Sequence, residues 1–283
     1  MKDRDDAIRP PTDDLRVARY APGWGYAARE WSRALENLDW PGAELLKSHE
    51  RGSVWLTPLT IGGRVHRTVL KVEALRSLRK RVQSILGRSK LHRQWRGAAL
   101  LARAGVPAAP PLAMLRGASG RRSCEVLVLD AIPGDTLLAL LARDPVPEER
   151  AGACAGIVAG HLRRMARAGL ANRDPKPSNI IVGSGNDGRP VVTFVDTEGV
   201  QRRRTALDEL AGRFLASLEL EVVGVGAEPP RTFAGLIARA VGAAGTADPA
   251  EIESRSRGIM DRARQIVAGH ADPTPKHDPL RRP

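Results

Sequence analysis

Three side chains with oxygen donors are spaced so that they can meet at one place. Asp174 and Asn179 stand five residues apart in a polar, proline-rich loop that follows an apolar helical segment and precedes a short strand. Asp196 ends the next strand, and a small β hairpin would return it to the loop. A carboxylate that orients an acceptor hydroxyl, beside hard oxygen ligands for Mg²⁺, is what phosphoryl transfer requires. The spacing alone also fits an ordinary turn.

Two lysines supply the positive charge that such chemistry needs. Lys176 lies two residues beyond Asp174 and can contact a phosphate during transfer. Lys71 stands alone in an apolar segment, residues 68–72, that is typical of a strand. The helix before the loop, the strand after it, Asp196 and this upstream lysine together favour phosphotransfer over a plain turn.

The first half of the chain is expected to form a small antiparallel β lobe with one main helix. Residues 1 to about 20 are charged and contain prolines, so we predict that they are mobile, and residues 26–35 have the spacing of a short helix. The pattern then predicts strands at 53–56, 68–72, 111–115 and 124–129, hairpin turns at Gly62-Gly63 and at 117–120, and a helix over 74–104 that is interrupted at Gly87.

The second half is expected to be larger and mostly helical. The pattern predicts helices at 137–142 (capped by Asp135 or Thr136) and 148–168, short strands at 179–182 and 190–195, and helices from Thr205 onward. This is an α+β class with two lobes. The predicted organisation is an N-terminal extension at 1–44, a β lobe at 45–130, a helical lobe at 131–272 and a loose tail at 273–283.

Composition narrows the partners. The chain has 283 residues, a formal charge of +13 and a pI near 10.8, which favours anionic partners. Nucleic acid is disfavoured, because no helix-turn-helix, zinc or RNP-type motif is present and aromatic residues make up only 4%. Cys124 and Cys154 lack metal-like or redox spacing, which fits a reducing cytosol. The N-terminus has no signal-peptide pattern, and no apolar run reaches the ~18 residues that cross a bilayer.

The loop also carries a family resemblance. NRDPKPSNIIV, residues 172–182, resembles the catalytic loop of the protein-kinase-like superfamily, typically HRDLKPSNILV, and is most similar to that of bacterial lipopolysaccharide kinases, which phosphorylate Kdo or heptose in the inner core. The similarity covers about residues 45–220. Its other segments are individually less specific, and they are Gly52-Ser53-Val54-Trp55, Val69-Leu70-Lys71, residues 92–96 with Gly105-Val106-Pro107, Phe194-Val195-Asp196 and residues 207–211.

The resemblance implies a two-lobed protein-kinase-like fold and a kinase that uses ATP and Mg²⁺. The implied nucleotide contacts lie in the predicted β lobe, and the implied catalytic residues lie in the predicted helical lobe. The implied roles are phosphate contact for Lys71, approach of a hairpin to the triphosphate at Gly52 and Ser53, catalytic base for Asp174 with Lys176 beside it, and Mg²⁺ ligands for Asn179 and Asp196. Asp208 would brace the catalytic loop, or else is an ordinary carboxylate at a helix N-terminus.

This sequence departs from the family pattern at four places. Asn172 replaces the histidine of the loop, at a position whose role is mainly structural. Gln94 replaces the helix glutamate that pairs with Lys71; it can hydrogen-bond a lysine but cannot neutralise it, which leaves Glu73 or Glu125 as substitutes. The phosphate loop has one glycine, and Gly199 stands one position later than in a DFG-like motif. A catalytically inactive kinase-fold scaffold therefore stays open as an alternative.

The segment after Asp196 bears on the acceptor. Only about a dozen residues separate it from the helix near Thr205, and no Ala-Pro-Glu motif follows, so there is no room for the long segment that holds a peptide substrate. A sugar or glycolipid acceptor is favoured, above all lipopolysaccharide inner core. The alternatives are an aminoglycoside-like small-molecule kinase and a protein Ser/Thr kinase. Arg202-Arg203-Arg204 could hold acceptor phosphates or form a solvated turn.

A basic segment suggests where the protein acts. Residues 74–124 contain no Asp or Glu but many Arg and Lys, with Leu75, Leu78, Val82 and Leu86 between them. Such a segment can lie on an anionic membrane face, or it can be a solvated helix packed on the small lobe. The expected location is the cytoplasm, with peripheral contact to the inner face of the cytoplasmic membrane under the first reading.

Overall fold

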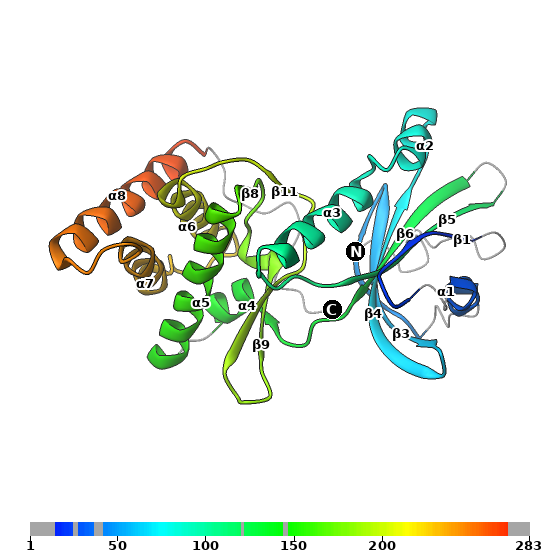
Figure 1. The fold of residues 1–283 in the computed structure, drawn as a ribbon, viewed down its shortest axis with the longest axis horizontal. Coiled ribbons are helices and arrows are strands. Elements are labelled where there is room, and N and C mark those ends of the chain that lie inside the picture. The colour runs from blue at the N-terminus through cyan, green and yellow to red at the C-terminus, as the bar shows by residue number, and fades with distance from the viewer. Residues whose placement is uncertain (1–14, 25–27, 37–41, 120–121, 144–146, 271–283) are drawn as a thin grey trace. The chain divides into compact units, whose positions relative to one another are not determined.

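The computed structural model describes residues 15–24, 28–36, 42–119, 122–143 and 147–270 (Figure 1). The chain is α+β and divides into two compact units. Among the described residues, unit 1 comprises those within 15–98 together with Ala109–Ala131, and unit 2 comprises Ala99–Ala108 and those within 132–270. Residues 99–108 thus group with the C-terminal part of the chain, whereas the predicted boundaries assign them to the β lobe.

Unit 1 is built on a six-stranded antiparallel sheet. Its strand order is β1-β5-β6-β4-β3-β2, with bounds β1 (Arg16–Tyr20), β2 (Glu44–His49), β3 (Gly52–Ile61), β4 (Arg64–Ala74), β5 (Pro111–Ser119) and β6 (Arg122–Asp130). The four predicted strands are confirmed and are longer than expected. The Gly62-Gly63 turn is also confirmed, since both residues have positive φ, as a type I′ turn requires.

Two expectations for unit 1 are wrong. Residues 16–20 were expected to be mobile, but they form edge strand β1, which pairs with β5 from Arg16↔Arg116 to Tyr20↔Ala113. Their charged side chains hid the strand, because an exposed edge tolerates charge and shows no apolar alternation. Residues 117–119 continue β5 instead of turning, and residues 120–121 lie outside the described part of the chain.

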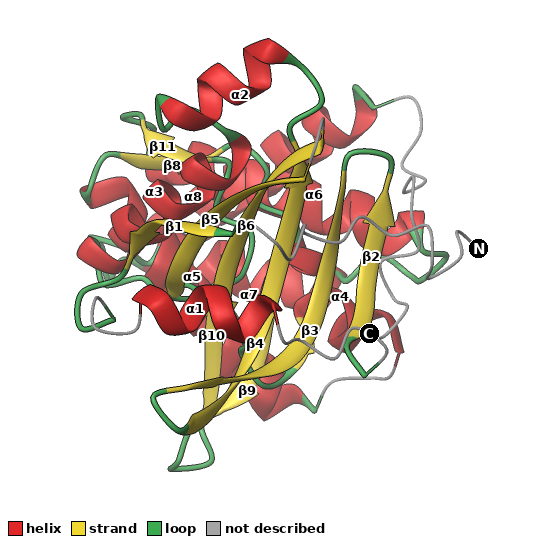
Figure 2. Cartoon of the chain, turned by 90° about the vertical axis from the view of Figure 1, so that its right-hand side faces the viewer, coloured by secondary structure: helices red, strands yellow, loops and turns green. Residues whose placement is uncertain are grey.

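The two faces of this sheet are covered by different helices. Alternation along β6 directs Val128 toward a core that includes Trp31 and Leu35 of α1 (Ala28–Glu36), and Figure 2 shows α1 lying across the sheet. It directs Leu127 to the opposite face, against Trp95 of α3 (Lys90–Arg103). Helix α2 (Leu78–Ile85) precedes α3, and Gly87, with φ +65°, confirms the predicted break between them.

Unit 2 contains five helices, short strands and one 3₁₀ turn among the described residues. Its elements are β7 (Asp135–Thr136), α4 (Leu137–Arg143), α5 (Glu148–Arg167), β8 (Leu170–Asn172), η3 (Pro177–Asn179), β9 (Ile180–Ser184), β10 (Pro190–Phe194), β11 (Val200–Arg202), α6 (Leu207–Gly224), α7 (Arg231–Gly242) and α8 (Pro249–Ala268). The predicted helices and the β9–β10 hairpin are confirmed. Thr136 caps α4, since its Oγ1 accepts the Ala139 N–H at 3.0 Å.

The core of unit 2 fixes the helices that flank the predicted loop. Val158 and Leu162 of α5 are buried with Phe214 of α6 and Ile237 of α7 in one apolar cluster. Strands β7, β8 and β11 were not expected, because two or three residues are too few to show a period. None of the helices in the described ranges is both long and apolar enough to cross a membrane.

A buried carboxylate fastens α2 and α3 to the sheet of unit 1. Oε1 of Glu125, on β6, accepts a hydrogen bond from Ser84 of α2 and lies 3.3 Å from His92 Nδ1 of α3 and 3.4 Å from Arg116 Nε of β5. Burial opposes ionisation of Glu125, but hydrogen bonds from His92, Ser84 and Ser89 outweigh it, so its pKa lies below the ordinary 4.5.

We predict that Glu125→Gln lowers the free energy of unfolding by about 1–3 kcal/mol at neutral pH, because the Arg116 guanidinium then faces a neutral amide and Ser84 loses a charged acceptor. Since the folded-state pKa is depressed, the stabilisation by the carboxylate is present above about pH 4.5 and is lost as the pH falls through the folded-state pKa. Urea unfolding at stepwise lower pH should therefore show the gap between variant and wild type closing.

The matched control is Glu73→Gln. Glu73 pairs with Lys80 at 3.0 Å but is less deeply buried, so its loss should cost less. A wild-type advantage over Glu125→Gln that stays constant down to the acid unfolding of both proteins would contradict the assignment.

Candidate functional site

The loop that contains Asp174 is held by its own first residue. Asn172 ends β8, is buried, and uses its Oδ1 to accept the backbone N–H of Asp174 at 3.1 Å. A side chain that accepts the N–H two residues ahead is the Asx-turn arrangement. The N–H of Arg173 donates to the carbonyl of Gly199 at 3.0 Å, next to the β8–β11 pair Asn172↔Val200. The loop is thereby joined to the segment after Asp196, and Figure 1 shows β8 beside β11.

Gly199 packs directly against this turn. A Cβ at position 199 would lie 2.6 Å from Asn172 Oδ1, 3.1 Å from Asp174 N and 3.3 Å from Arg173 N. The first distance is shorter than any real Cβ contact, and the atoms concerned are backbone or a side chain already bonded to backbone. The sequence pattern explains Gly199 as a displaced motif glycine, whereas the structure gives a steric reason for it.

Asn179 and Asp196 lie at the same end of the β9–β10 hairpin. The ladder ends at Ile180↔Phe194, and one more hydrogen bond, from Val195 N–H to the Asn179 carbonyl at 2.9 Å, extends it. The residue after Val195 is Asp196, which is half-buried and has its Oδ1 shielded from solvent. The predicted ligands are therefore brought together by pairing of the backbone.

The donor chemistry at this end of the hairpin fits Mg²⁺. One carboxylate and one amide oxygen form a partial set of hard ligands, and Mg²⁺ commonly keeps waters and substrate phosphates as its remaining ligands. No group of three or more His, Cys, Asp or Glu residues in the described ranges is arranged to hold a metal by itself. Asn179 and Asp196 would thus be the protein's share of such a site.

Helix α5 contacts strand β10 of the hairpin through a buried histidine. His161 is buried, with Nε2 at 3.0 Å from the Val192 carbonyl of β10 and Nδ1 at 2.6 Å from Arg164 Nη2. Because a guanidinium only donates, Nδ1 is the acceptor and Nε2 carries the proton that bonds to Val192. Burial lowers the pKa of His161, which agrees with a neutral ring.

Asp174 and Lys176 form an exposed pair. Nζ of Lys176 lies 3.4 Å from Asp174 Oδ1, and both side chains are about half exposed, at 48% and 53%. Exposed pairs of this kind contribute little to stability, because water screens them. Both groups are therefore accessible to a ligand, with a cation beside the carboxylate.

Glu221 of α6 is a loop contact that sequence reasoning missed. One of its oxygens accepts the Ser178 N–H at 2.9 Å and the other accepts the Ser178 hydroxyl at 2.6 Å. Burial raises the pKa of Glu221, and Asp174 adds to the rise, while the Ser178 bonds and the Lys176 charge oppose it. No sequence signal links positions 43 residues apart without a known fold.

The hypothesis that Asp208 braces this loop is wrong. Its two oxygens bond to Arg255 of α8 at 2.8 Å and 3.5 Å, and Arg255 also donates to the carbonyls of Gly242 and Ala244 at the end of α7. Asp208 therefore joins α6 to α7 and α8, and the contact from α6 to the loop is made by Glu221.

The register of β8 and β11 places Arg202 at the end of the ladder that points away from the Asp174 loop. Arg202 pairs with Leu170, at the opposite end of the ladder from Asn172. Arg202, Arg203 and Arg204 are exposed there, and the Arg203 N–H donates to the Gly169 carbonyl at 2.8 Å. The ladder leaves these side chains near the end of α5, which favours the solvated turn over a direct grip on a group at Asp174.

The remaining predicted residues belong to unit 1. Gly52 opens β3, where a Cβ would lie 2.5 Å from the Val72 carbonyl, so the sheet itself requires glycine there. Ser53 is buried, and its Oγ accepts Trp55 Nε1 at 2.8 Å. Lys71 lies on β4 between Val54 and Leu127, on the sheet face that α3 covers.

Gln94, the helix residue expected to pair with Lys71, is buried. Gln94 is on α3, one residue before Trp95, and is 2% exposed. Of the two glutamates considered as substitutes, Glu73 pairs with Lys80, and Glu125 is bound by Ser84, His92 and Arg116. The structure thus gathers Asp174, Lys176, Asn179 and Asp196 in unit 2, while Gly52, Ser53, Lys71 and Gln94 stand in unit 1.

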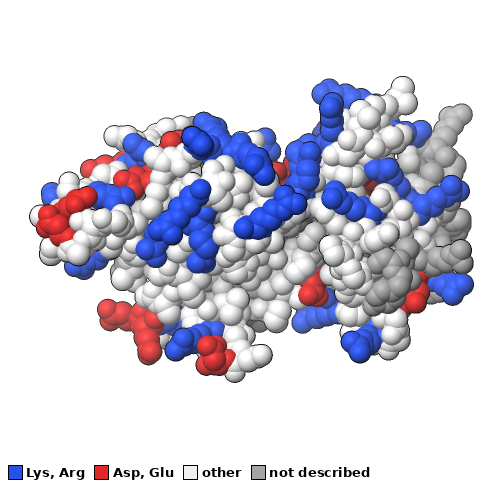
Figure 3. Space-filling model, in the orientation of Figure 1, with Lys and Arg blue, Asp and Glu red and all other residues white. Residues whose placement is uncertain are grey.

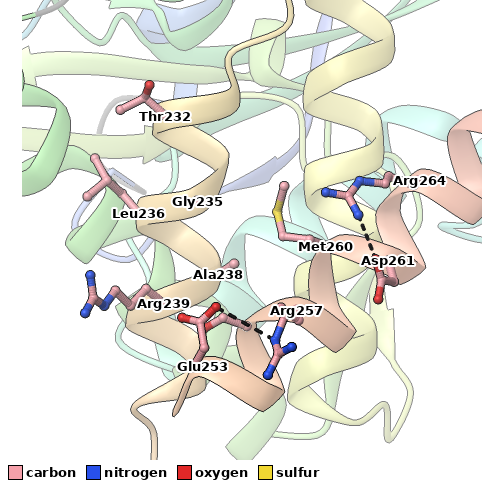
Figure 4. A pocket seen from close by; sticks show the side chains of 11 residues that line it. Thr232, Gly235, Leu236, Ala238, Arg239, Glu253, Arg257, Met260, Asp261 and Arg264 are labelled. Atoms are coloured by element: carbon pink, nitrogen blue, oxygen red, sulfur yellow. Dashed lines mark hydrogen bonds and ion pairs between the residues drawn. The ribbon is translucent and has the colours of Figure 1, made fainter. Parts of the chain in front are cut away.

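A surface pocket between α7 and α8 contains none of the predicted residues. Its volume is about 510 Å³, and Leu236, Ala238 and Met260 form its apolar part (Figure 4). Four of the charged residues that line it pair with each other, Glu253 with Arg257 at 3.8 Å and Asp261 with Arg264 at 2.7 Å, and Arg239 lines it as well. Since the pocket contains none of the residues that the sequence pattern assigns to phosphotransfer, the Asp174 loop is the better candidate for chemistry.

Comparison with known proteins found no relative, so the candidate site is assigned from the geometry of this chain. A scan against protein-family models gave no match, and a search of curated proteins found no significant relative.

We predict that Gly199→Ala destabilises the protein by about 1–3 kcal/mol, because an overpacked site forces a backbone shift. Gly156→Ala is the matched control. Nothing lies within 4 Å of a Cβ there, and the residue is inside α5, so the change should stabilise by about 0.5–1 kcal/mol. Thermal or urea unfolding measures both, and equal stability of Gly199→Ala and wild type would contradict the steric constraint.

We predict that Glu221→Gln loosens the loop, because the amide offers one acceptor oxygen where the carboxylate offers two. Loss of one hydrogen bond, about 1 kcal/mol, should speed amide exchange in residues 174–182 roughly fivefold. Hydrogen–deuterium exchange followed by mass spectrometry measures it, with Glu219→Gln on the same helix as control.

The same variant gives a pH signature. The folded-state pKa of Glu221 is raised, so wild type gains stability as the pH falls through that pKa, and the glutamine variant lacks this gain. Unchanged exchange together with an unchanged pH profile would rule out a positioning role for Glu221.

Proposed function

We propose that this chain is an ATP-dependent phosphotransferase with a two-lobed protein-kinase-like fold, which transfers the γ-phosphate to a hydroxyl of a sugar or glycolipid in the cytoplasm. One observation carries the proposal. The Val195 N–H bonds to the Asn179 carbonyl while the Arg173 N–H bonds to the Gly199 carbonyl, so the loop of Asp174 and the segment of Asp196 are paired on both sides. The similarity of residues 172–182 to a kinase catalytic loop supports the same reading.

In the proposed reaction, Asp174 orients the acceptor hydroxyl and takes its proton. The acceptor oxygen forms a bond to the γ-phosphorus as the bond to the leaving oxygen of ADP breaks. Lys176 supplies positive charge beside the transferred group. Asn179 and Asp196 would hold Mg²⁺, which when bound neutralises phosphate charge. Lys71 is assigned to the nucleotide phosphates. Gln94, at the family's glutamate position, and Gly52 and Ser53, at the start of β3, are assigned to the same nucleotide site.

The segment after Asp196 supports a sugar acceptor. Residues 197–206 connect it to α6, and three of them form β11, which is occupied in pairing with β8. Such a short, paired connection leaves no free stretch to hold a peptide, whereas a sugar hydroxyl needs none. Lipopolysaccharide inner-core Kdo or heptose is the acceptor that the loop's resemblance favours, and an aminoglycoside-like compound or a protein hydroxyl is the alternative.

A second candidate is a catalytically inactive kinase-fold scaffold. The observation that favours it is Gln94 on α3, an uncharged side chain at the family's glutamate position that can hydrogen-bond a lysine but cannot neutralise it. A scaffold of this kind could still bind nucleotide, because phosphate contacts do not require a catalytic base.

We predict that purified protein with Mg²⁺ and labelled ATP transfers phosphate to lipopolysaccharide core, and that Asp174→Asn lowers the rate about 10²–10⁴-fold, as loss of a general base does. Asp196→Ala should be equally damaging. Asp187→Asn, in the exposed turn of the same hairpin, is the matched control and should keep the activity.

Acceptors compared side by side separate the alternatives. Small sugars, an aminoglycoside and a protein mixture should be tested beside the core glycan, and labelling of proteins alone would refute the sugar acceptor. A rise in melting temperature with ATP and Mg²⁺ but no transfer to any acceptor would indicate the scaffold. Full activity of both Asp174→Asn and Asp196→Ala would overturn the catalytic assignment.

A further inference from the structure

Helix α2 presents its apolar side to solvent. Leu78, Val82, Ile85 and Leu86 are 77%, 43%, 70% and 59% exposed. Their spacing of i, i+4, i+7 and i+8 places them on one face of the helix, the pattern that normally faces a core. The other exposed large hydrophobic residues of the described chain are scattered singly along the sequence.

The polar side of α2 is the side that contacts the sheet. Lys80 Nζ bonds to Glu73 at 3.0 Å, and Ser84, the buried residue of the helix, donates to Glu125. Ser77 caps the N-terminus by accepting the Lys80 N–H at 3.3 Å. The helix is therefore fixed with its apolar stripe outward, and the exposure of this stripe does not result from a frayed end.

Basic residues border the stripe. At 100° per residue, Arg79 and Arg81 fall on its two sides, and the exposed residues Arg76, Arg88 and Lys90 lie just before and after the helix. No Asp or Glu occurs anywhere in residues 74–124. Figure 3 shows Lys and Arg prevailing over Asp and Glu on the face it draws.

We propose that this α2 surface, the stripe of Leu78, Val82, Ile85 and Leu86 with its flanking arginines, docks on an anionic lipid bilayer. Apolar side chains gain by leaving water for the acyl boundary, while guanidinium groups at the same depth meet anionic headgroups. Both features are needed for interfacial binding, and α2 has both on one exposed side.

Other occupants fit less well. The eight residues of α2 span about 12 Å. A helix of this length cannot by itself bury the roughly 800 Å² per partner that is typical of a stable protein interface. A second copy would also bring its arginines against these arginines. Nucleic acid would use the charges but leave the apolar stripe in water. The docking proposal does not depend on the proposed phosphotransferase activity.

The test measures sedimentation of the full-length protein with vesicles of phosphatidylcholine alone or mixed with phosphatidylglycerol. Wild type should bind the anionic vesicles at least about tenfold more tightly than the neutral ones. Leu78→Ser combined with Ile85→Ser should lower binding to anionic vesicles about tenfold or more, although net charge is unchanged. The matched control is Val65→Ser, which removes a 71% exposed side chain elsewhere in unit 1 and should bind like wild type.

A second measurement reports insertion directly. Ile85→Trp should show a blue shift of its emission with anionic vesicles and none with neutral ones, when compared with wild type. Because the altered residues are exposed, circular dichroism and melting temperature should match wild type.

Several outcomes would overturn the proposal. These are equal binding of the double serine variant and wild type, equal binding to neutral and anionic vesicles, and a lipid-free dimer that the serine variant abolishes. Nucleic-acid binding that is insensitive to the serine changes, without vesicle binding, would overturn it too. Failure here would leave phosphate transfer to a soluble core glycan untouched, so the two proposals are tested separately.

Discussion

A glycine without room for a side chain sets the geometry on which the candidate site depends. Gly199 packs against the Asx turn of Asn172 and Asp174, and its carbonyl accepts the Arg173 N–H. On the other side of Asp196, Val195 donates to the Asn179 carbonyl. Asp196 therefore lies in a short segment bonded to the loop at both ends. Backbone atoms make these bonds, so the relation between Asp174, Asn179 and Asp196 does not depend on flexible side chains.

Helices α5 and α6 make polar contacts with the hairpin and with the loop that carry the candidate site. His161 reaches β10 from α5, and Glu221 reaches Ser178 from α6. Burial lowers the pKa of His161 and raises the pKa of Glu221, because desolvation disfavours the charged form of each group. The histidine is suited to this, because a neutral ring is all that its contact needs. Glu221 is less suited to burial, because both of its carboxylate oxygens act as acceptors for Ser178. Its burial beside Asp174 therefore costs stability that the contact with Ser178 must offset.

The sequence predicted the parts of the fold that have a local cause. The Gly62-Gly63 turn, the break at Gly87 and the long periodic helix α5 each follow from a few adjacent residues. The loop from Asn172 to Asn179 was found for the same reason. Strands β8 and β11 are too short to show a period, and β1 is an edge strand with charged side chains. The contacts of Glu221 with Ser178 and of Asp208 with Arg255 join distant positions, so only the folded chain reveals them.

Strand β10 ends the order β10-β9-β7, and an open edge of this kind is ordinarily a place where another strand can add. Two of its outward backbone groups already have partners: the Val192 carbonyl accepts His161, and the Phe194 N–H donates to the Pro107 carbonyl at 3.1 Å. A foreign strand would have to break both bonds before it could pair. Both bonds therefore oppose the addition of a strand at this edge of the hairpin that ends in Asn179 and Asp196.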